Sequence, residues 1–220
     1  MPPHRLPRAV VFDMDGLMFN TEALHTDVGS ELLQRRGYIF DAELKNAMMG
    51  RPGRVALKVM IDRHGLLETA EELMAESELI FEEILASRLE MMPGLTELLA
   101  ALESAGLPKA VATSSGIGFV RNVMSRFQLE PRFQFILTAE DVVEGKPHPE
   151  IYLKAAARLG LDPADVLVLE DSHNGCTAAA AAGMFTVAVP GEPSRHHDFS
   201  RASLVIDTLR DPRLYQALGL

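Results

Sequence analysis

The 220-residue sequence contains few of the residues that mark a secreted, membrane-spanning or nucleic-acid-binding protein. It has one cysteine, Cys176, which excludes an internal disulfide and a thiolate metal cluster and suits a reducing compartment. Its longest apolar runs fall well short of the roughly 20 residues of a membrane helix. The net charge of −10 disfavours contact with nucleic-acid phosphates. We therefore expect a cytoplasmic protein that binds neither nucleic acid nor membrane.

Hydrophobic residues make up 47% of the chain, and from Met92 onward they alternate between strand-like and helix-like patterns. The strand-like segments after Met92 are KAVATSS at 109–115, FQFILT at 133–138, DVLVLED at 165–171, FTVAVP at 185–190 and SLVI at 203–206, and an earlier one is AVVF at 9–12. Helix-like segments of about 10 to 15 residues separate most of them. This alternation predicts an α/β fold in which a doubly wound parallel sheet carries helices on both faces.

The region between the first and second predicted strands has a different pattern. Residues 40–90 show helical periodicity, as in LKVMIDRHG and LLETAEELMAESELIFEEILASRLE, without a convincing strand. The first strand thus lies before a helical insertion, and the remaining strands lie after it. We predict an α/β core of residues 1–17 and 89–220, interrupted by a small α-helical domain of residues 18–88.

Polar residues follow the predicted strands at the point where each strand ends. In open parallel sheets the ligand site lies beyond these carboxyl ends. The polar residues there are Asp13 and Asp15, Thr113 and Ser114, Lys146, and Glu170 and Asp171. Asp13 and Asp15 are two positions apart in an extended segment and therefore point to the same side. The sequence thus predicts four carboxylates, one ammonium and several hydroxyls at one edge of the sheet.

The charges of these residues indicate what the site binds. Four carboxylates close together repel one another, and Lys146 offsets only one of them, so the cluster implies a bound divalent cation. Oxygen ligands favour Mg²⁺ over zinc. Each motif alone has an ordinary explanation, such as a turn, a helix cap or a solvated lysine. Together, at four successive strand ends, they indicate one site for phosphoryl transfer, in which Thr113 and Ser114 donate hydrogen bonds to a phosphate.

The segments FDMDG, ATSSG, GKPHPE and LEDSHNG resemble the four motifs of the haloacid dehalogenase-like (HAD) superfamily. DMDGLMFNTEALH and EDSHNGCTAAAAAGM resemble the branch that contains β-phosphoglucomutase and small sugar-phosphate phosphatases. The resemblance implies a Rossmannoid core in which Asp13 is the nucleophile that forms an aspartyl-phosphate and Asp15 is the general acid and base. It also implies that Thr113 and Lys146 hold the phosphoryl group. It assigns the Mg²⁺ ligands to Asp13, the Asp15 carbonyl, Asp171 and, through water, Glu170.

The same resemblance makes the helical insertion a cap that closes over the site and selects the substrate. Thr21 and His25 lie four residues apart on a predicted helix and share a face, and in the mutase branch a threonine and a histidine at these positions help to place Asp15. Arg51 and Arg54, in GRPGR, are candidates for binding an anionic group of the substrate. The ordinary alternatives are a histidine on the cap surface and two solvated loop arginines.

We therefore expect a Mg²⁺-dependent phosphomonoester hydrolase that acts on a small phosphorylated metabolite, such as a sugar phosphate, and is a monomer or a weak dimer. The first alternative is β-phosphoglucomutase. It is disfavoured because the mutase has a Lys-Asn pair where this chain has Gly116 and Ile117, and a lysine in a late cap helix that is rich in glutamate here. The second alternative is a catalytically inactive HAD-fold binding protein, which would show a damaged motif, and none of the four motifs is damaged.

Overall fold

The computed structural model describes residues 5–48, 53–192 and 194–220, and the chain divides into two compact units. The core unit comprises Met1–Asn20 and Met91–Leu220, and the helical unit comprises Thr21–Glu90. These boundaries fall a few residues after the predicted ones at 17/18 and 88/89. Among the described residues, no helix has both the length and the apolar character needed to span a bilayer.

The core unit contains a six-stranded sheet within the described residues, and its strands all pair in parallel. In chain order the strands are β1 (Ala9–Phe12), β2 (Lys109–Ala112), β3 (Ile136–Leu137), β4 (Val166–Glu170), β5 (Phe185–Ala188) and β6 (Leu204–Val205). Their order across the sheet is β3-β2-β1-β4-β5-β6, so β1 lies between β2 and β4. The predicted α/β fold with a parallel sheet is confirmed.

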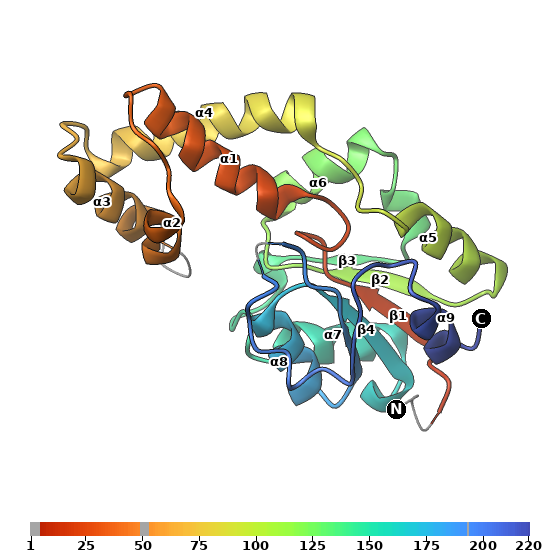
Figure 1. Ribbon diagram of the computed structural model, residues 1–220. Coiled ribbons are helices and arrows are strands. Elements are labelled where there is room, and N and C mark those ends of the chain that lie inside the picture. The colour runs from red at the N-terminus through yellow and green to blue at the C-terminus, as the bar shows by residue number, and fades with distance from the viewer. Residues whose placement is uncertain (1–4, 49–52, 193) are drawn as a thin grey trace. The chain divides into compact units, whose positions relative to one another are not determined.

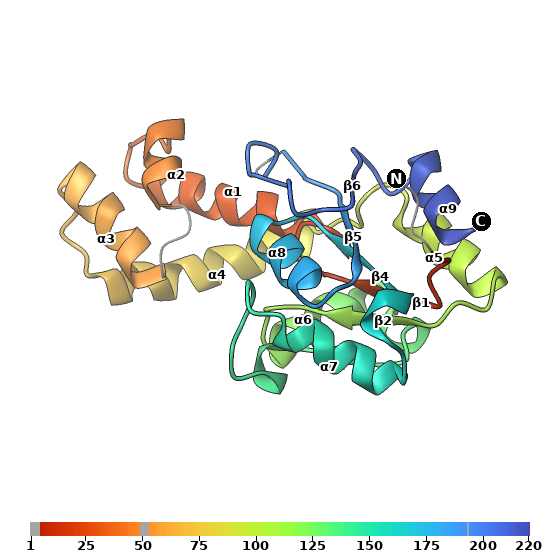
Figure 2. The same cartoon turned by 90° about the horizontal axis from the view of Figure 1, so that it is seen from below.

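Helices cover both faces of this sheet, as the doubly wound topology requires. Figure 1 shows α5 (Leu95–Ser104) and α6 (Ile117–Arg126) on one side of the strands, with α7 (Glu150–Leu159) and α8 (His173–Ala181) on the other. Figure 2 shows the same unit from below, with α9 (Pro212–Leu218) near the C-terminus. Short 3-10 helices, η1 (Glu130–Arg132), η2 (Ala139–Asp141) and η3 (Pro163–Asp165), lie in the connections.

The central strands form where the sequence is continuously apolar. All residues of β1 (AVVF) and β4 (VLVLE) are buried, because helices cover both faces of the sheet. The predicted strands are longer than the observed ones at their polar ends. The KAVATSS segment leaves the sheet after Ala112, so Thr113 and the two serines lie in the loop beyond β2. The sheet therefore presents its polar residues just past the strand ends.

The helical unit consists of α1 (Thr21–Gln34), α2 (Ala42–Met48), α3 (Gly53–His64) and α4 (Ala70–Arg88). Its own apolar cluster is formed by Val28, Leu32, Leu33, Leu44, Leu57, Met60, Leu73 and Ile80. The prediction placed a helix over the whole segment from Leu66 onward, but α4 begins at Ala70. A reciprocal capping box explains this start, since Thr69 and Glu72 each accept a backbone hydrogen bond from the other.

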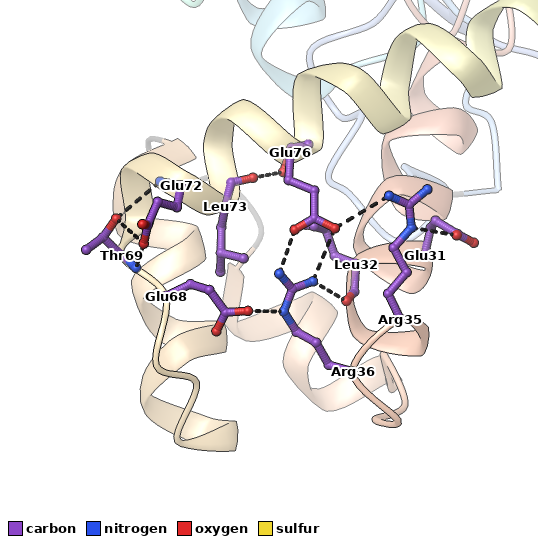
Figure 3. A network of polar contacts seen from close by, with 10 residues as sticks. Glu31, Leu32, Arg35, Arg36, Glu68, Thr69, Glu72, Leu73 and Glu76 are labelled. Atoms are coloured by element: carbon purple, nitrogen blue, oxygen red, sulfur yellow. Dashed lines mark hydrogen bonds and ion pairs between the residues drawn. The ribbon is translucent and has the colours of Figure 1, made fainter.

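A network of ion pairs joins the turn just after α1 to α4 and to the segment just before it, inside the helical unit (Figure 3). The Arg36 guanidinium donates to Glu76 at 2.5 Å, to Glu68 at 2.7 Å and to the Leu32 carbonyl at 2.8 Å. The Arg36 side chain is only 17% exposed, so solvent screens these contacts less than it screens a surface pair. Arg35 adds contacts to Glu31 of α1 and to Glu76 of α4. The acidic face of α4 is therefore partly neutralised by the two arginines that directly follow α1.

Candidate active site

The site begins at Asp13, the first residue after the central strand β1. Its backbone N–H donates to the Leu169 carbonyl of β4 at 3.0 Å, which fixes this position at the end of the sheet. Its side chain is buried, and Oδ1 accepts a hydrogen bond from the Lys146 ammonium at 2.5 Å. Burial raises the pKa of Asp13 well above its usual range; Lys146 opposes this effect, while Glu170 and Asp15 add to it. The environment thus favours a bound positive charge beside this carboxylate.

Asp15 lies two residues further on, and its carboxylate has different partners. Oδ2 accepts hydrogen bonds from the Ser115 hydroxyl at 2.6 Å and from the Thr113 hydroxyl at 3.1 Å. The Thr113 oxygen in turn accepts from the Ser115 backbone N–H at 3.0 Å, so the loop after β2 holds both hydroxyls in place. Ser114, predicted as a phosphate donor, is exposed in the same loop. Ser115 was not among the predicted site residues, although the TSS run places three hydroxyls at this strand end.

Lys146 lies in the loop before α7, and its side chain is only 5% exposed. Its ammonium donates to Asp13, to Glu170 at 2.7 Å and to the Ala112 carbonyl at 2.9 Å. Burial alone would lower the pKa of Lys146, but attraction to the Asp13 and Glu170 carboxylates raises it. The side chain therefore stays an ammonium at neutral pH and partly offsets the acidic cluster.

Three buried carboxylates can meet around one ion. Asp13, Glu170 and Asp171 each place one oxygen within 4.8 Å of the others. The backbone makes room for Asp171 at Gly16, whose φ is +75° and where an added Cβ would lie 2.2 Å from the Asp171 Oδ2. A buried set of carboxylate oxygens, with excess negative charge, fits a hard divalent cation.

The predicted cap residues belong to the helical unit. Thr21 is the buried first residue of α1, and His25, exposed on the same helix, stacks on the Phe81 ring with centroids 4.3 Å apart. Arg54 forms an ion pair with Glu71. Arg51 lies outside the described residues. The substrate-binding roles of these four residues stay predictions.

Comparison with known proteins gives consistent results. A family model described as haloacid dehalogenase-like hydrolase matches residues 10–189. The chain is 36% identical over 207 residues to a probable pseudouridine-5'-phosphatase of Drosophila melanogaster, covering 91% of this chain and 89% of that protein. It is 32% identical over 180 residues to a phosphorylated carbohydrates phosphatase of Thermotoga maritima, covering 80% and 82%. Among solved structures, CbbY from Rhodobacter sphaeroides in complex with phosphate superposes with a TM-score of 0.76 at 27% identity, covering 98% of this chain and all of that one.

Proposed function

Since the chain belongs to the haloacid dehalogenase-like hydrolase family and is a phosphatase, we propose that it hydrolyses a small phosphorylated metabolite, such as a sugar phosphate, through an aspartyl-phosphate on Asp13. The observation that carries this proposal is the pair of aspartates after β1. Asp13 contacts an ammonium, and Asp15 contacts two hydroxyls. One carboxylate is thus placed to attack phosphorus and the other to transfer protons.

The proposed reaction has two chemical steps. In the first, an Asp13 oxygen attacks phosphorus, the bond from phosphorus to the ester oxygen breaks, and Asp15 gives its proton to the leaving alkoxide. In the second, water attacks the phosphorus of the aspartyl-phosphate and gives a proton to Asp15, which restores Asp13 and releases inorganic phosphate. Thr113 and Ser115 orient Asp15. Lys146 stabilises charge on the phosphoryl oxygens, and Thr113 and Ser114 are the proposed hydroxyl donors to the phosphoryl group.

We propose Mg²⁺ as the metal, held by the carboxylates of Asp13 and Asp171 and the backbone carbonyl of Asp15, with Glu170 beside them. When bound, Mg²⁺ supplies positive charge to the phosphoryl oxygens. The oxygen donor set supports this choice over softer metals. We also propose that the helical unit selects the substrate, with Thr21, His25 and the arginines at 51 and 54 as candidate contacts.

β-Phosphoglucomutase activity is the second candidate function. One observation favours it, namely that Thr21 and His25 occupy positions i and i+4 of α1. A mutase must also bind a second phosphate, which requires further cationic donors. Arg54 pairs with Glu71, and Arg36 pairs with Glu68 and Glu76, so these arginines are already engaged by carboxylates. Hydrolysis is therefore the function that we favour.

The test is phosphate release from a panel of phosphate monoesters, with and without Mg²⁺. β-Glucose 1-phosphate is included, with coupled detection of glucose 6-phosphate. We expect Mg²⁺-dependent release from one or several esters, and a loss on the order of 10³-fold or more in Asp13→Asn. Asp165→Asn is the matched control, because Asp165 is also buried but lies just before β4, at the opposite end of that strand from Glu170. Glucose 6-phosphate formation without phosphate release would instead establish the mutase.

A further inference from the structure

Tyr152 is a buried polar residue that the reaction described above does not use. It is the largest fully buried side chain of the core unit, on α7, within the apolar cluster on one face of the sheet. Its hydroxyl nevertheless donates to the Glu170 Oε1 at 2.6 Å. Burial raises the pKa of Tyr152, and the Glu170 charge raises it further, so the hydroxyl keeps its proton and stays a donor. Tyr152 therefore joins the hydrophobic core to the acidic site.

Glu170 is held on both of its oxygens. Oε1 accepts from Tyr152 and from Lys146, while Oε2 accepts from the Ser172 backbone N–H at 3.2 Å and the Ser172 hydroxyl at 2.9 Å. The residue is fully buried, and Gly175 packs so close that an added Cβ would lie 1.7 Å from Oε1. The four hydrogen-bond donors and the close packing of Gly175 leave this carboxylate little freedom to rotate.

The position of Lys146 depends on this arrangement. The ammonium has three protons, and it contacts three acceptors, on Glu170, Asp13 and Ala112. Its nitrogen also lies 5.0 Å from the centroid of the Tyr152 ring, within the range of a cation–π contact. Tyr152 thus contacts Lys146 directly through its ring and indirectly through Glu170.

We propose that Tyr152 is a positioning residue, whose hydroxyl fixes Glu170 so that this carboxylate holds the Lys146 ammonium against Asp13. This inference rests on the proposed role of Asp13 as nucleophile. A preorganised ammonium needs no reorganisation when the phosphoryl group is transferred, so it lowers the barrier more than a mobile one does. The hydroxyl of Tyr152 therefore contributes to the rate although it lies in the core.

Tyr152→Phe tests the proposal, because phenylalanine keeps the ring and removes only the hydroxyl. We expect kcat to fall about 10-fold while KM changes less than about twofold. The Mg²⁺ concentration for half-maximal activity stays within about twofold, since the Tyr152 hydroxyl donates to Glu170 rather than to a proposed direct ligand of the ion. Tyr215→Phe is the matched control. It removes the same atom from a partly buried tyrosine of α9 whose charged neighbours are Glu97 and Arg210, and it leaves the kinetics unchanged.

A double-mutant cycle with Glu170→Gln separates positioning from packing. If Tyr152 acts through Glu170, adding Tyr152→Phe to Glu170→Gln lowers kcat by less than about twofold. The proposal would be overturned if the kcat of the double variant fell by the product of the two single-variant factors. It would also be overturned if the kcat of Tyr152→Phe stayed within twofold of wild type.

A second readout does not depend on turnover. The buried Lys146 ammonium, held by three acceptors, is expected to give a slowly exchanging side-chain ¹H–¹⁵N resonance in the wild-type protein and a broadened one in Tyr152→Phe. An unchanged resonance would also overturn the proposal. If the wild-type enzyme released no phosphate from any ester, or Asp13→Asn matched it, the proposed function would fail, while the resonance comparison would still decide whether Tyr152 fixes Lys146.

Discussion

At the scale of single residues, the two aspartates after β1 have different surroundings although one residue separates them. The Asp13 carboxylate contacts an ammonium and lies near two further buried carboxylates. The Asp15 carboxylate contacts the hydroxyls of Thr113 and Ser115. Different environments give two similar side chains different chemistry, which supports the roles proposed for them, nucleophile for Asp13 and proton donor for Asp15.

Asp15→Asn is expected to separate these roles. Turnover of an alkyl phosphate falls about 10²–10⁴-fold, because the alkoxide leaving group needs a proton. With p-nitrophenyl phosphate, whose leaving group departs without protonation, rapid-mixing absorbance measurements show a burst of about one nitrophenolate per enzyme, followed by slow turnover. The burst arises because the second step still needs a base. Asp13→Asn serves as the control and shows no burst; wild-type rates on alkyl phosphates in Asp15→Asn would refute the assignment.

Gly16 keeps the space that Asp171 occupies. Gly16→Ala places a Cβ against the Asp171 carboxylate, and we expect the Mg²⁺ concentration for half-maximal activity to rise at least about 10-fold. Gly106→Ala is the matched control, because Gly106 also has a positive φ, +66°, but among the described residues other than its chain neighbours no atom lies within 4 Å of the added Cβ. Both variants lose about 1–2 kcal/mol of unfolding free energy to backbone strain. Equal Mg²⁺ requirements in the two variants would contradict this role for Gly16.

At the scale of secondary-structure elements, Glu103 joins α5 to the start of β2 and to η1. It accepts two hydrogen bonds from Arg132, both at 2.8 Å, and pairs with Lys109 at 3.0 Å. The contacts with Arg132 and then Lys109 lower the pKa of Glu103 from 4.5 to about 2. Between these two pH values the unfolded chain binds more protons at this residue than the folded one. The contribution of Glu103 is therefore complete above about pH 4.5 and is lost as the pH falls toward 2.

Glu103→Gln is expected to lower the free energy of unfolding at pH 7 by at most about 1 kcal/mol, because the Glu103 side chain is 41% exposed and solvent screens it. Urea unfolding followed from pH 7 to pH 3 should show the difference between variant and wild type shrink below pH 4.5. High salt at pH 7 should reduce it as well. A difference that is constant with pH would exclude the ion pairs as its source.

For the helical unit, the ion pairs of Arg36 lead to a further prediction about the free energy of unfolding. Arg36→Met removes the donors to Glu68 and Glu76 and leaves Glu76 with the weaker contact to Arg35. We expect the free energy of unfolding to fall by about 1–2 kcal/mol. Hydrogen exchange in α1 and α4, measured by mass spectrometry, is expected to become faster. Lys58→Met is the control, because Lys58 forms an exposed pair with Asp62 and its replacement should cost about 0.5 kcal/mol or less. Unchanged exchange in α1 and α4 would show that apolar packing alone holds these helices together.

At the scale of the whole molecule, the sequence predicts the sheet well because its strands are buried on both faces and therefore read as apolar runs. Strand ends are harder to predict, since FQFILT contributes just two residues, Ile136 and Leu137, to β3. The helix α9 was not predicted either, although its start, with Asp211 as the N-cap and Pro212 after it, is a recognisable helix signal.

The candidate site was predictable to the extent that strand ends determine it. Asp13, Lys146 and Asp171 follow from the rule that ligands bind beyond the carboxyl ends of parallel strands. The partners of Glu170 do not follow, because the choice of Tyr152 and Ser172 as donors depends on how α7 and α8 pack on the sheet. A tyrosine at an apolar helical position has the same sequence pattern as any core residue. The hydrogen bond that its hydroxyl donates to Glu170 can therefore be found only in the structure.

The central place of β1 has a consequence for biosynthesis. Val10 lies opposite Lys109 on one side and Leu167 on the other, so β1 is completed by strands that come much later in the chain. The residues of the helical unit are contiguous in the chain and emerge long before β4 does. The segment that carries Asp13 can therefore pair with β2 and β4 only after these later strands have been translated. Asp13, the proposed nucleophile, is thus made before the strands that fix its final position.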